Sequence, residues 1–157
     1  MHFDNRKRVM TLNTRRYIVI LVCFVVFVII NFSGWFRKPV MGIKKETYIL
    51  IELFIYIFYV LYTYLMNYNY IFFTDDSGKF TFKFVSLRPF DNKKKLIEIH
   101  KKDFDNSSFK KSFFNLKTDL TLYANTANGV VSYPSISLSA LSKEQIQILK
   151  KTLQNNK

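Results

Sequence analysis

The stretch YIVILVCFVVFVIINFSGWF at residues 17–36 contains no acidic or basic side chain, and Arg15 and Arg16 precede it while Arg37 and Lys38 follow it. As an α-helix it would be about 30 Å long, which matches the hydrocarbon core of a bilayer. Fourteen of its residues are Ile, Val, Leu or Phe, and each favours insertion by roughly 0.3 to 0.6 kcal/mol. A β-strand would usually end after about six residues, and no cleavage site of the signal-peptide type follows. The stretch is therefore predicted to span a membrane.

A second apolar stretch, residues 48–66, follows the first after a loop that contains Pro39 and Gly42. Its Ile, Leu, Phe and Val residues together favour insertion by roughly 3 to 7 kcal/mol. Residues 37–47 are too few to cross the bilayer again. The two stretches are therefore expected to form an antiparallel transmembrane hairpin over residues 17–66.

Polar side chains in the second stretch recur at steps of four, three and four residues, so they lie on one face of a helix. Because polar groups avoid lipid, this face is expected to pack on the first helix, on another membrane protein or on a second copy of the chain. The alternative is a chance arrangement in a tyrosine-rich segment. The residues are Glu52, Tyr56, Tyr59 and Thr63, with Tyr70 at a further step of seven.

The formal net charge of +13 is spread unevenly along the chain. Residues 1–16, interpreted as a basic N-terminal tail, carry five Lys and Arg residues, and Lys79 and Lys83 follow the second stretch, whereas the loop between the stretches carries four. Since basic residues near the ends of membrane spans stay on the cytoplasmic side, both termini and the C-terminal region are expected in the cytoplasm.

From residue 67 onward, apolar residues recur at every second position, as they do in β-strands. Phe80, Phe82 and Phe84 alternate with Thr81 and Lys83, which is typical of a half-buried strand. Residues 70–73 precede a turn at 75–78 and are expected to form a hairpin with 80–85. Further turns are expected at 88–92, 103–108 and 128–129, and further strands at 95–101, through Phe113, Phe114 and Leu116, at 119–125 and at 130–138.

Residues 143–154 are predicted to form a C-terminal amphipathic helix. Ser142 and Gln145 have the spacing of a capping box, and Ile146, Leu149 and Leu153 follow on one face. Together with the strands, this helix makes residues 67–157 one small domain. The fold class predicted for the chain is an α+β membrane protein, a transmembrane hairpin followed by a small antiparallel β-barrel or sandwich closed by a C-terminal helix.

This layout, with the segments KFVSLRPF at 83–90, KLIEI at 95–99 and SISLSALS at 135–142, resembles the bacterial pleckstrin-homology-like (PH-like) membrane proteins of unknown function. The resemblance implies a strongly bent β-barrel or sandwich whose open end is plugged by the C-terminal helix, and it implies a bacterial inner membrane. It implies no catalytic residues. The phosphoinositide-binding basic motif of eukaryotic relatives is matched only by Lys79, Lys83 and Arg88, so lipid specificity does not follow from it.

Four lysines flank the polar turn expected at 103–108, and they are therefore expected to meet at one end of a hairpin. They are Lys101, Lys102, Lys110 and Lys111. At a membrane surface each would contribute about 1 kcal/mol of attraction to anionic lipid heads. The alternative interpretation is that they are solvated strand ends that discourage edge-to-edge aggregation.

Metal, cofactor and nucleophile sites are not predicted. Asp103 and Asp105 resemble the start of a calcium loop, but Phe114 stands where the loop requires Glu. His2, His100 and Cys23 lack metal-ligand spacing, and a single cysteine allows no disulfide within the chain. Ser135, Ser137 and Ser139 have no evident base partner.

The function expected from these features is that of a non-catalytic integral membrane protein. It would present a basic PH-like domain at the membrane surface for protein docking or for contact with anionic lipid. The alternative is an accessory subunit that braces a larger transport or secretion complex. Nucleic-acid binding is not expected, because Phe80, Phe82 and Phe84, which would have to stack on bases, are the best candidates for the core.

Overall fold

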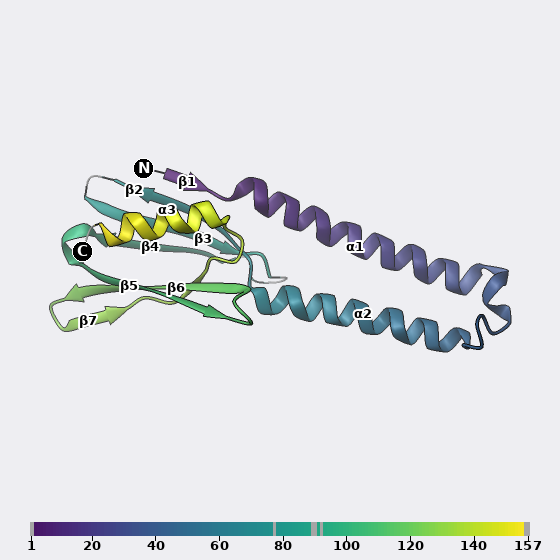
Figure 1. Ribbon diagram of the computed structural model, residues 1–157. Coiled ribbons are helices and arrows are strands. Elements are labelled where there is room, and N and C mark those ends of the chain that lie inside the picture. Colours follow the sequence, from purple (N-terminus) through teal and green to yellow (C-terminus); the bar gives the residue numbers. More distant parts are fainter. Residues whose placement is uncertain (1, 77, 89–90, 92, 156–157) are drawn as a thin grey trace. The chain divides into compact units, whose positions relative to one another are not determined.

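The computed structural model describes residues 2–76, 78–88, 91 and 93–155, and the chain divides into two compact units (Figure 1). The helical unit is Met10–Leu65, and the β unit combines Met1–Val9 with Met66–Lys157. The fold class is α+β, as predicted. The β unit is built from two segments that are separated in the sequence, and the helical unit is the stretch of sequence between these segments.

Two long helices run antiparallel in the helical unit. They are α1 (Arg6–Phe32), whose first residues belong to the β unit, and α2 (Lys45–Met66), with η1 (Gly34–Arg37) between them. Both are long and apolar enough to cross a membrane. In each helix, only 6% of the most apolar 18-residue segment is buried. The predicted tight loop is present, because Val40 pairs with Ile43 across Met41 and Gly42, which have φ angles of 53° and 78°.

Residues 2–16 do not form the predicted polar tail. His2–Asp4 forms β1, which pairs antiparallel with β2 (Asn69–Asp75), and the ring of Phe3 lies 5.3 Å from that of Phe73. The backbone N–H of Arg6 donates to Asp4 Oδ1 (3.2 Å), and the helix starts there. α1 therefore begins well before the predicted span at 17–36, and it ends earlier, at Phe32. Met1 lies outside the described residues.

The first sheet has the strand order β1-β2-β3-β4, all antiparallel. β3 (Lys79–Ser86) and β4 (Lys94–His100) follow the predicted alternation in their apolar residues, since Phe80, Phe82 and Phe84 of β3 and Ile97 and Ile99 of β4 are buried. Thr81, predicted on the outer face, is buried as well. The predicted hairpin between 70–73 and 80–85 is confirmed by the pairing of β2 with β3. The turn predicted at 88–92 includes residues 89, 90 and 92, which lie outside the described residues.

The second sheet differs from the prediction in its first hairpin. η2 (Lys101–Asp103) leads into β5 (Phe104–Ser112), so most of the polar turn predicted at 103–108 is a strand. The turn lies instead at 113–116, where a strand was predicted. β6 (Lys117–Thr126) buries Leu120, Leu122 and Ala124, and it pairs with β5, β7 (Gly129–Ser132) and β8 (Ile136–Ser137). Pairing with this apolar strand overrides the turn propensity of Asp105 to Ser108.

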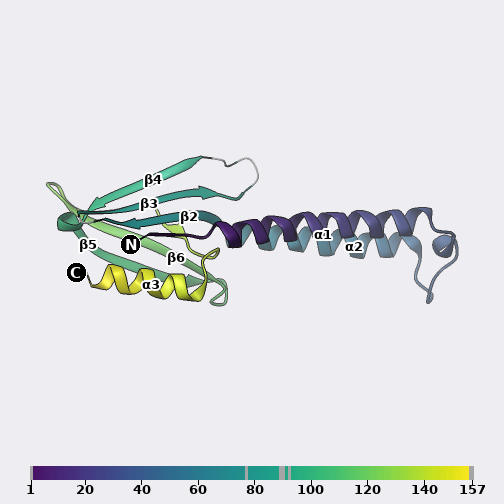
Figure 2. The same cartoon turned by 90° about the horizontal axis from the view of Figure 1, so that it is seen from above.

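The core of the β unit lies between the two sheets and α3 (Lys143–Gln154), which Figure 2 shows running along the unit. The bounds of α3 and its capping box are as predicted. Ser142 Oγ accepts from Gln145 N (3.1 Å), and Ser142 N donates to Gln145 Oε1 (3.0 Å). Leu149 and Leu153 are buried and Ile146 packs on the core. No pairing among the described strands joins the two sheets, so the predicted barrel does not close.

Candidate functional site

Buried polar side chains gather where the chain leaves the β unit for the helices. Asn5, between β1 and α1, is 2% exposed. Its Nδ2 donates to the carbonyl oxygens of Asn69 (2.9 Å) and Ala140 (3.3 Å), and its Oδ1 accepts from the N–H of Ile71 (2.8 Å). One side chain therefore ties the first segment of the chain to β2 and to the loop before α3.

The same network holds the point where the chain returns from the helices. Asn69 is buried and its Nδ2 donates to the carbonyl of Ser137 (3.2 Å). The Oγ of Ser137, also buried, donates to the carbonyl of Met66 (3.1 Å), the last residue of α2. This bond satisfies one of the carbonyls left unpaired at a helix C-terminus. We call Asn5, Asn69 and Ser137 the junction network.

Sequence reasoning did not predict the junction network. Asn5 stands beside a three-residue strand, and its partner Ile71 lies 66 positions further along the chain. Ser137 was considered only as a nucleophile without a base, whereas its hydroxyl bonds to a backbone carbonyl and lies 3.1 Å from Ser139 Oγ. Pairing at such separations leaves no local pattern.

The β unit has two distinct ends. The junction end contains the junction network, the last residues of β3, the first residues of β4, the turn between β5 and β6, and the start of α3. The distal end contains the last residues of β2, the first residues of β3, η2, the turn between β6 and β7, and the end of α3. β2, which runs from Asn69 at the junction end to Asp75 at the distal end, separates them by about 20 Å.

The four lysines predicted to meet at one hairpin end lie at opposite ends of β5. Lys101 and Lys102 are in η2 at the distal end. Lys110 and Lys111 lie near the other end of β5, where their backbones are opposite those of Asp119 and Thr118 in β6. The eight residues from Lys102 to Lys110 separate the pairs by about 25 Å. The prediction of one cluster is therefore wrong, because the turn assumed between them is a strand.

The distal pair is partly engaged in the fold. Lys101 Nζ lies 2.7 Å from Asp75 Oδ1 and 5.4 Å from the centroid of the Phe80 ring. Lys110 and Lys111 are exposed, and neither has an acidic partner within the part of the chain that the structure describes. Lys110 and Lys111 are the pair that remains available to a ligand.

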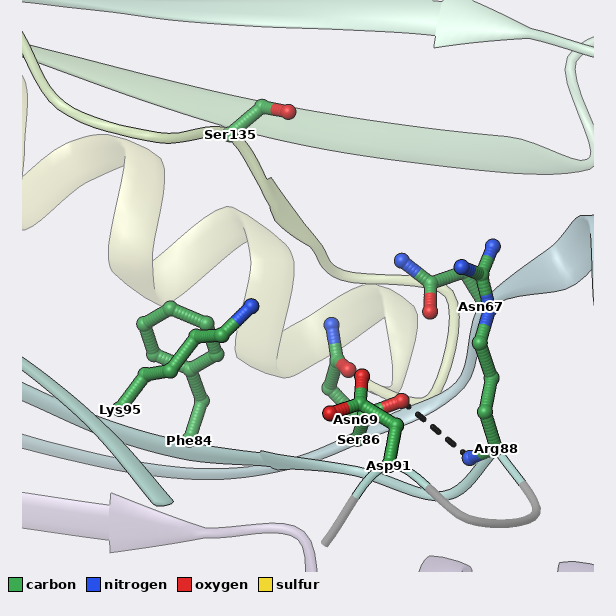
Figure 3. Close-up of a pocket in the computed structure, with 8 residues that line it drawn as sticks. All are labelled: Asn67, Asn69, Phe84, Ser86, Arg88, Asp91, Lys95 and Ser135. Carbon is green, nitrogen blue, oxygen red and sulfur yellow. Dashed lines mark hydrogen bonds between the residues drawn. The ribbon is translucent and has the colours of Figure 1, made fainter. Parts of the chain in front are cut away.

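The weaker basic candidates are spread along β3. Lys79 pairs with Glu98 (3.3 Å) towards the distal end, and Lys83 Nζ lies 6.0 Å from the centroid of the Phe72 ring. Arg88 lies beyond the end of β3, where its backbone N–H donates to Ser86 Oγ (3.2 Å; Figure 3). They do not form one basic cluster.

A cavity of about 90 Å³ lies at the junction end (Figure 3). Its lining is mostly polar and comes from Asn67, Asn69, Phe84, Ser86, Arg88, Asp91, Lys95 and Ser135. This volume is that of about three water molecules, and binding sites for metabolites usually have several hundred Å³. The cavity is therefore suited to water or a small ion.

Charge differs between the two ends. At the junction end, where α3 begins, eight basic side chains stand against three acidic ones, namely Arg88, Lys93, Lys94, Lys95, Lys110, Lys111, Lys117 and Lys143 against Asp91, Asp119 and Glu144. At the distal end, where α3 ends, five basic side chains stand against five acidic ones, namely Lys79, Lys101, Lys102, Lys150 and Lys151 against Asp75, Asp76, Glu98, Asp103 and Asp105. The end of the β unit where the helices attach is thus positive, whereas the charges at the other end balance.

The turn between β5 and β6 presents apolar side chains to solvent at the junction end. Phe113, Phe114 and Leu116 are 40%, 92% and 58% exposed. Phe113, Phe114 and Asn115 have φ angles of 52°, 53° and 64°, a conformation that costs L-residues roughly 1 to 2 kcal/mol each in a left-handed helix. We call residues 113–116 the hairpin tip.

The polar face predicted on α2 is present over four residues. Glu52, Tyr56, Tyr59 and Thr63 all lie in α2 and are half-buried, whereas most of the residues between them are exposed. Tyr70 lies in β2 and is not part of that face. Thr63 Oγ1 donates to the carbonyl of Val60 (2.8 Å), and among the described residues Glu52 Oε2 has no hydrogen-bond partner.

Among the described residues, no three His, Cys, Asp or Glu side chains come together as they would around a metal ion. Comparisons with models of protein families, with curated proteins and with solved structures find no match for this chain.

Proposed function

We propose that this chain is a non-catalytic integral membrane protein whose α1–α2 hairpin crosses the bilayer and whose β unit meets anionic lipid heads with its junction end. The observation that carries the proposal is the coincidence of positive charge with the end at which the chain departs for the helices. The cytoplasmic leaflet is anionic and attracts basic residues within about one Debye length, roughly 8 to 10 Å. A positive end placed there is attracted, whereas the distal end, whose charges balance, gains no such attraction.

The apolar helices support membrane insertion. In a soluble protein, a core helix as long as these would be largely covered by the rest of the chain. Here only 6% of the most apolar 18-residue segment of each helix is buried. Their exposed Ile, Leu, Val and Phe side chains would be costly in water and favourable in lipid.

The β unit supports an arrangement in which both ends of the hairpin lie on one side of the membrane. β1 precedes α1 and β2 follows α2, and the two strands pair in the same sheet. By the positive-inside rule, the five basic residues between Arg6 and Arg16 favour the cytoplasm for this side.

A PH-like classification of the β unit belongs to the same proposal. Two antiparallel sheets followed by an amphipathic helix that packs on the core are compatible with it. The alternative function, a bracing subunit of a membrane complex, gains less support. A partner in the membrane would be expected to bind the polar face of α2. That face is already half-buried within this chain, so less of it is open to a partner.

Cysteine labelling would test the membrane arrangement. In a Cys23→Ser background, Met41→Cys reports the loop between the helices and Asn128→Cys reports the distal turn of the β unit. In sealed inner-membrane vesicles, an impermeant maleimide is expected to label only one of the two positions, and both after detergent is added. Labelling of both in sealed vesicles, or release of the protein by carbonate, would overturn the membrane-spanning arrangement.

Lipid contact would be tested with the full chain in nanodiscs. Amide hydrogen exchange of residues 86–95 and 110–119 is expected to slow when zwitterionic lipid is replaced by anionic lipid. The distal segments 98–106 and 124–130 serve as the internal control and are expected to be unaffected. If the exchange rates at both ends were the same in anionic and in zwitterionic lipid, the positive end would not contact anionic lipid heads.

A further inference from the structure

We propose that the hairpin tip is a lipid-insertion site, in which Phe113, Phe114 and Leu116 enter the interface of the bilayer that holds α1 and α2 while Lys110 and Lys111 contact its anionic head groups. This inference rests on the proposed function and adds a second membrane contact to it. Its ligand is a lipid surface, recognised by apolar side chains beside unpaired positive charge.

A chain of contacts fixes the tip at the junction end. Ser137 Oγ donates to the carbonyl of Met66, Ser137 pairs with Asp119 of β6, and Leu138 N donates to the carbonyl of Thr118 (2.7 Å). Residues 118 and 119 are therefore level with the point where α2 enters the β unit.

The tip extends beyond that level in the direction away from the distal end. β6 runs from the tip towards the distal turn, and the last pair of the hairpin is Ser112 with Lys117. Three further residues of chain, from Asp119 back to Leu116, span about 10 Å. The tip is thus a projection at the end of the β unit where Asn5 and Met66 lie.

The composition of the tip suits the interface of a bilayer. Its residues FFNL carry no acidic group, and the nearest acid, Asp119, is paired with Lys117 (3.1 Å). Phe and Leu side chains are typical of the apolar face of segments that lie in the membrane interface, and lysines beside them can reach the phosphates. A left-handed backbone at three consecutive residues turns these side chains outward although none of them is Gly.

The distal hairpin supplies a matched control. The turn between β6 and β7 is followed by Val130 and Val131, which are 59% and 46% exposed. It belongs to the same sheet and also presents apolar side chains, but it lies at the opposite end of β6. Lys101 and Lys102 are likewise the distal match for Lys110 and Lys111.

The test uses the full chain reconstituted in vesicles of phosphatidylcholine with phosphatidylglycerol. Trp35, the single tryptophan, is replaced by Phe, and one reporter is introduced, either Phe114→Trp or Val130→Trp. Spin-labelled lipids then quench the reporter according to its depth. The indole at position 114 is expected to be quenched by shallow labels and shifted to shorter wavelength, whereas the indole at position 130 is expected to behave as in water.

Charge variants provide a second readout in the Phe114→Trp background. Since each basic residue contributes about fivefold to membrane partitioning, Lys110→Gln with Lys111→Gln is expected to lower the inserted fraction relative to the free fraction about thirtyfold. Lys101→Gln with Lys102→Gln is expected to leave it unchanged. Leu116→Trp replaces Phe114→Trp as the reporter if the latter protein does not fold.

Two outcomes would overturn the inference. Equal quenching at positions 114 and 130 would mean that the tip does not contact lipid, and a concentration-dependent signal at position 114 without lipid quenching would mean that the tip binds a second copy of the chain. Trp35 in the unmodified chain reports helix insertion independently. If Trp35 is quenched and the tip is not, the proposed function survives and only the tip contact fails.

Discussion

The two ends of the β unit differ in how deeply their polar side chains are buried, although a partly exposed ion pair, Lys117–Asp119, is present at the junction end too. At the junction end, Asn5, Asn69 and Ser137 are almost completely buried and bond to backbone groups. At the distal end, partly exposed side chains form the ion pairs Asp75–Lys101 and Lys79–Glu98. Buried groups are costly when left unpaired, whereas exposed ion pairs contribute little. The end that carries the helices is therefore the end at which substitutions should matter most.

The largest effect is expected from Asn5→Ala. It would leave the N–H of Ile71 and the carbonyls of Asn69 and Ala140 without this partner, at a cost of roughly 2 to 4 kcal/mol. Unfolding of the full chain in mild detergent should show this loss, and the Ile71 amide should exchange faster. Asn13→Ala, on the exposed surface of α1, is the control. Equal stability of both variants would mean that the junction network does not hold β1 in place.

The sequence predicts those elements whose partners are close along the chain. The capping box and apolar face of α3 and the alternation in β3 are local patterns, and both elements form as predicted. β1 could not be predicted in this way, because three residues show no period and their partners in β2 lie about seventy positions away.

The candidate site was predicted in part. The four lysines were identified, but their grouping depended on a turn at 103–108. Asp105, Asn106, Ser107 and Ser108 favour turns locally, yet all four lie in β5 and the last three pair with β6. Phe113 and Phe114, which favour strands, lie in the turn. The junction end as a charged surface emerges only once the strands bring residues 93–95 and 110–119 to one end.

A smaller loss is expected from Ser137→Ala. The substitution removes the hydrogen bond to the Met66 carbonyl but leaves the backbone bond from Asn69 Nδ2 in place, so the free energy of unfolding should fall by about 1 kcal/mol. Measured under the same conditions, Ser135→Ala, which is exposed, should change it little. If Ser137→Ala costs no more than Ser135→Ala, α2 does not depend on this bond where it joins the β unit.

The distal end should respond less. Asp75→Asn removes the charge that faces Lys101, whose side chain is 27% exposed, and Asp75 itself is 18% exposed. A loss of at most about 1 kcal/mol is expected, and it should shrink at high salt because solvent ions screen such pairs. Denaturant titrations at low and high salt would measure it. A loss as large as that of Asn5→Ala would remove the contrast between the two ends.

The smallest effect on folding is expected at the hairpin tip. Phe114→Gly relieves a left-handed backbone conformation that costs roughly 1 kcal/mol, and it adds a comparable entropy cost to folding. Because the Phe114 side chain is 92% exposed, little burial is lost in detergent, so the free energy of unfolding should change by less than about 0.5 kcal/mol. Leu122→Gly, at a buried position of β6, should lose several times more.

A loss of more than about 1 kcal/mol for Phe114→Gly would mean that the Phe114 ring stabilises the β unit itself. Membrane contact would then not be needed to explain why Phe occupies this exposed position. An unchanged stability would mean that the role of the ring lies outside the fold of the β unit, and the quenching measurement tests whether that role is lipid contact.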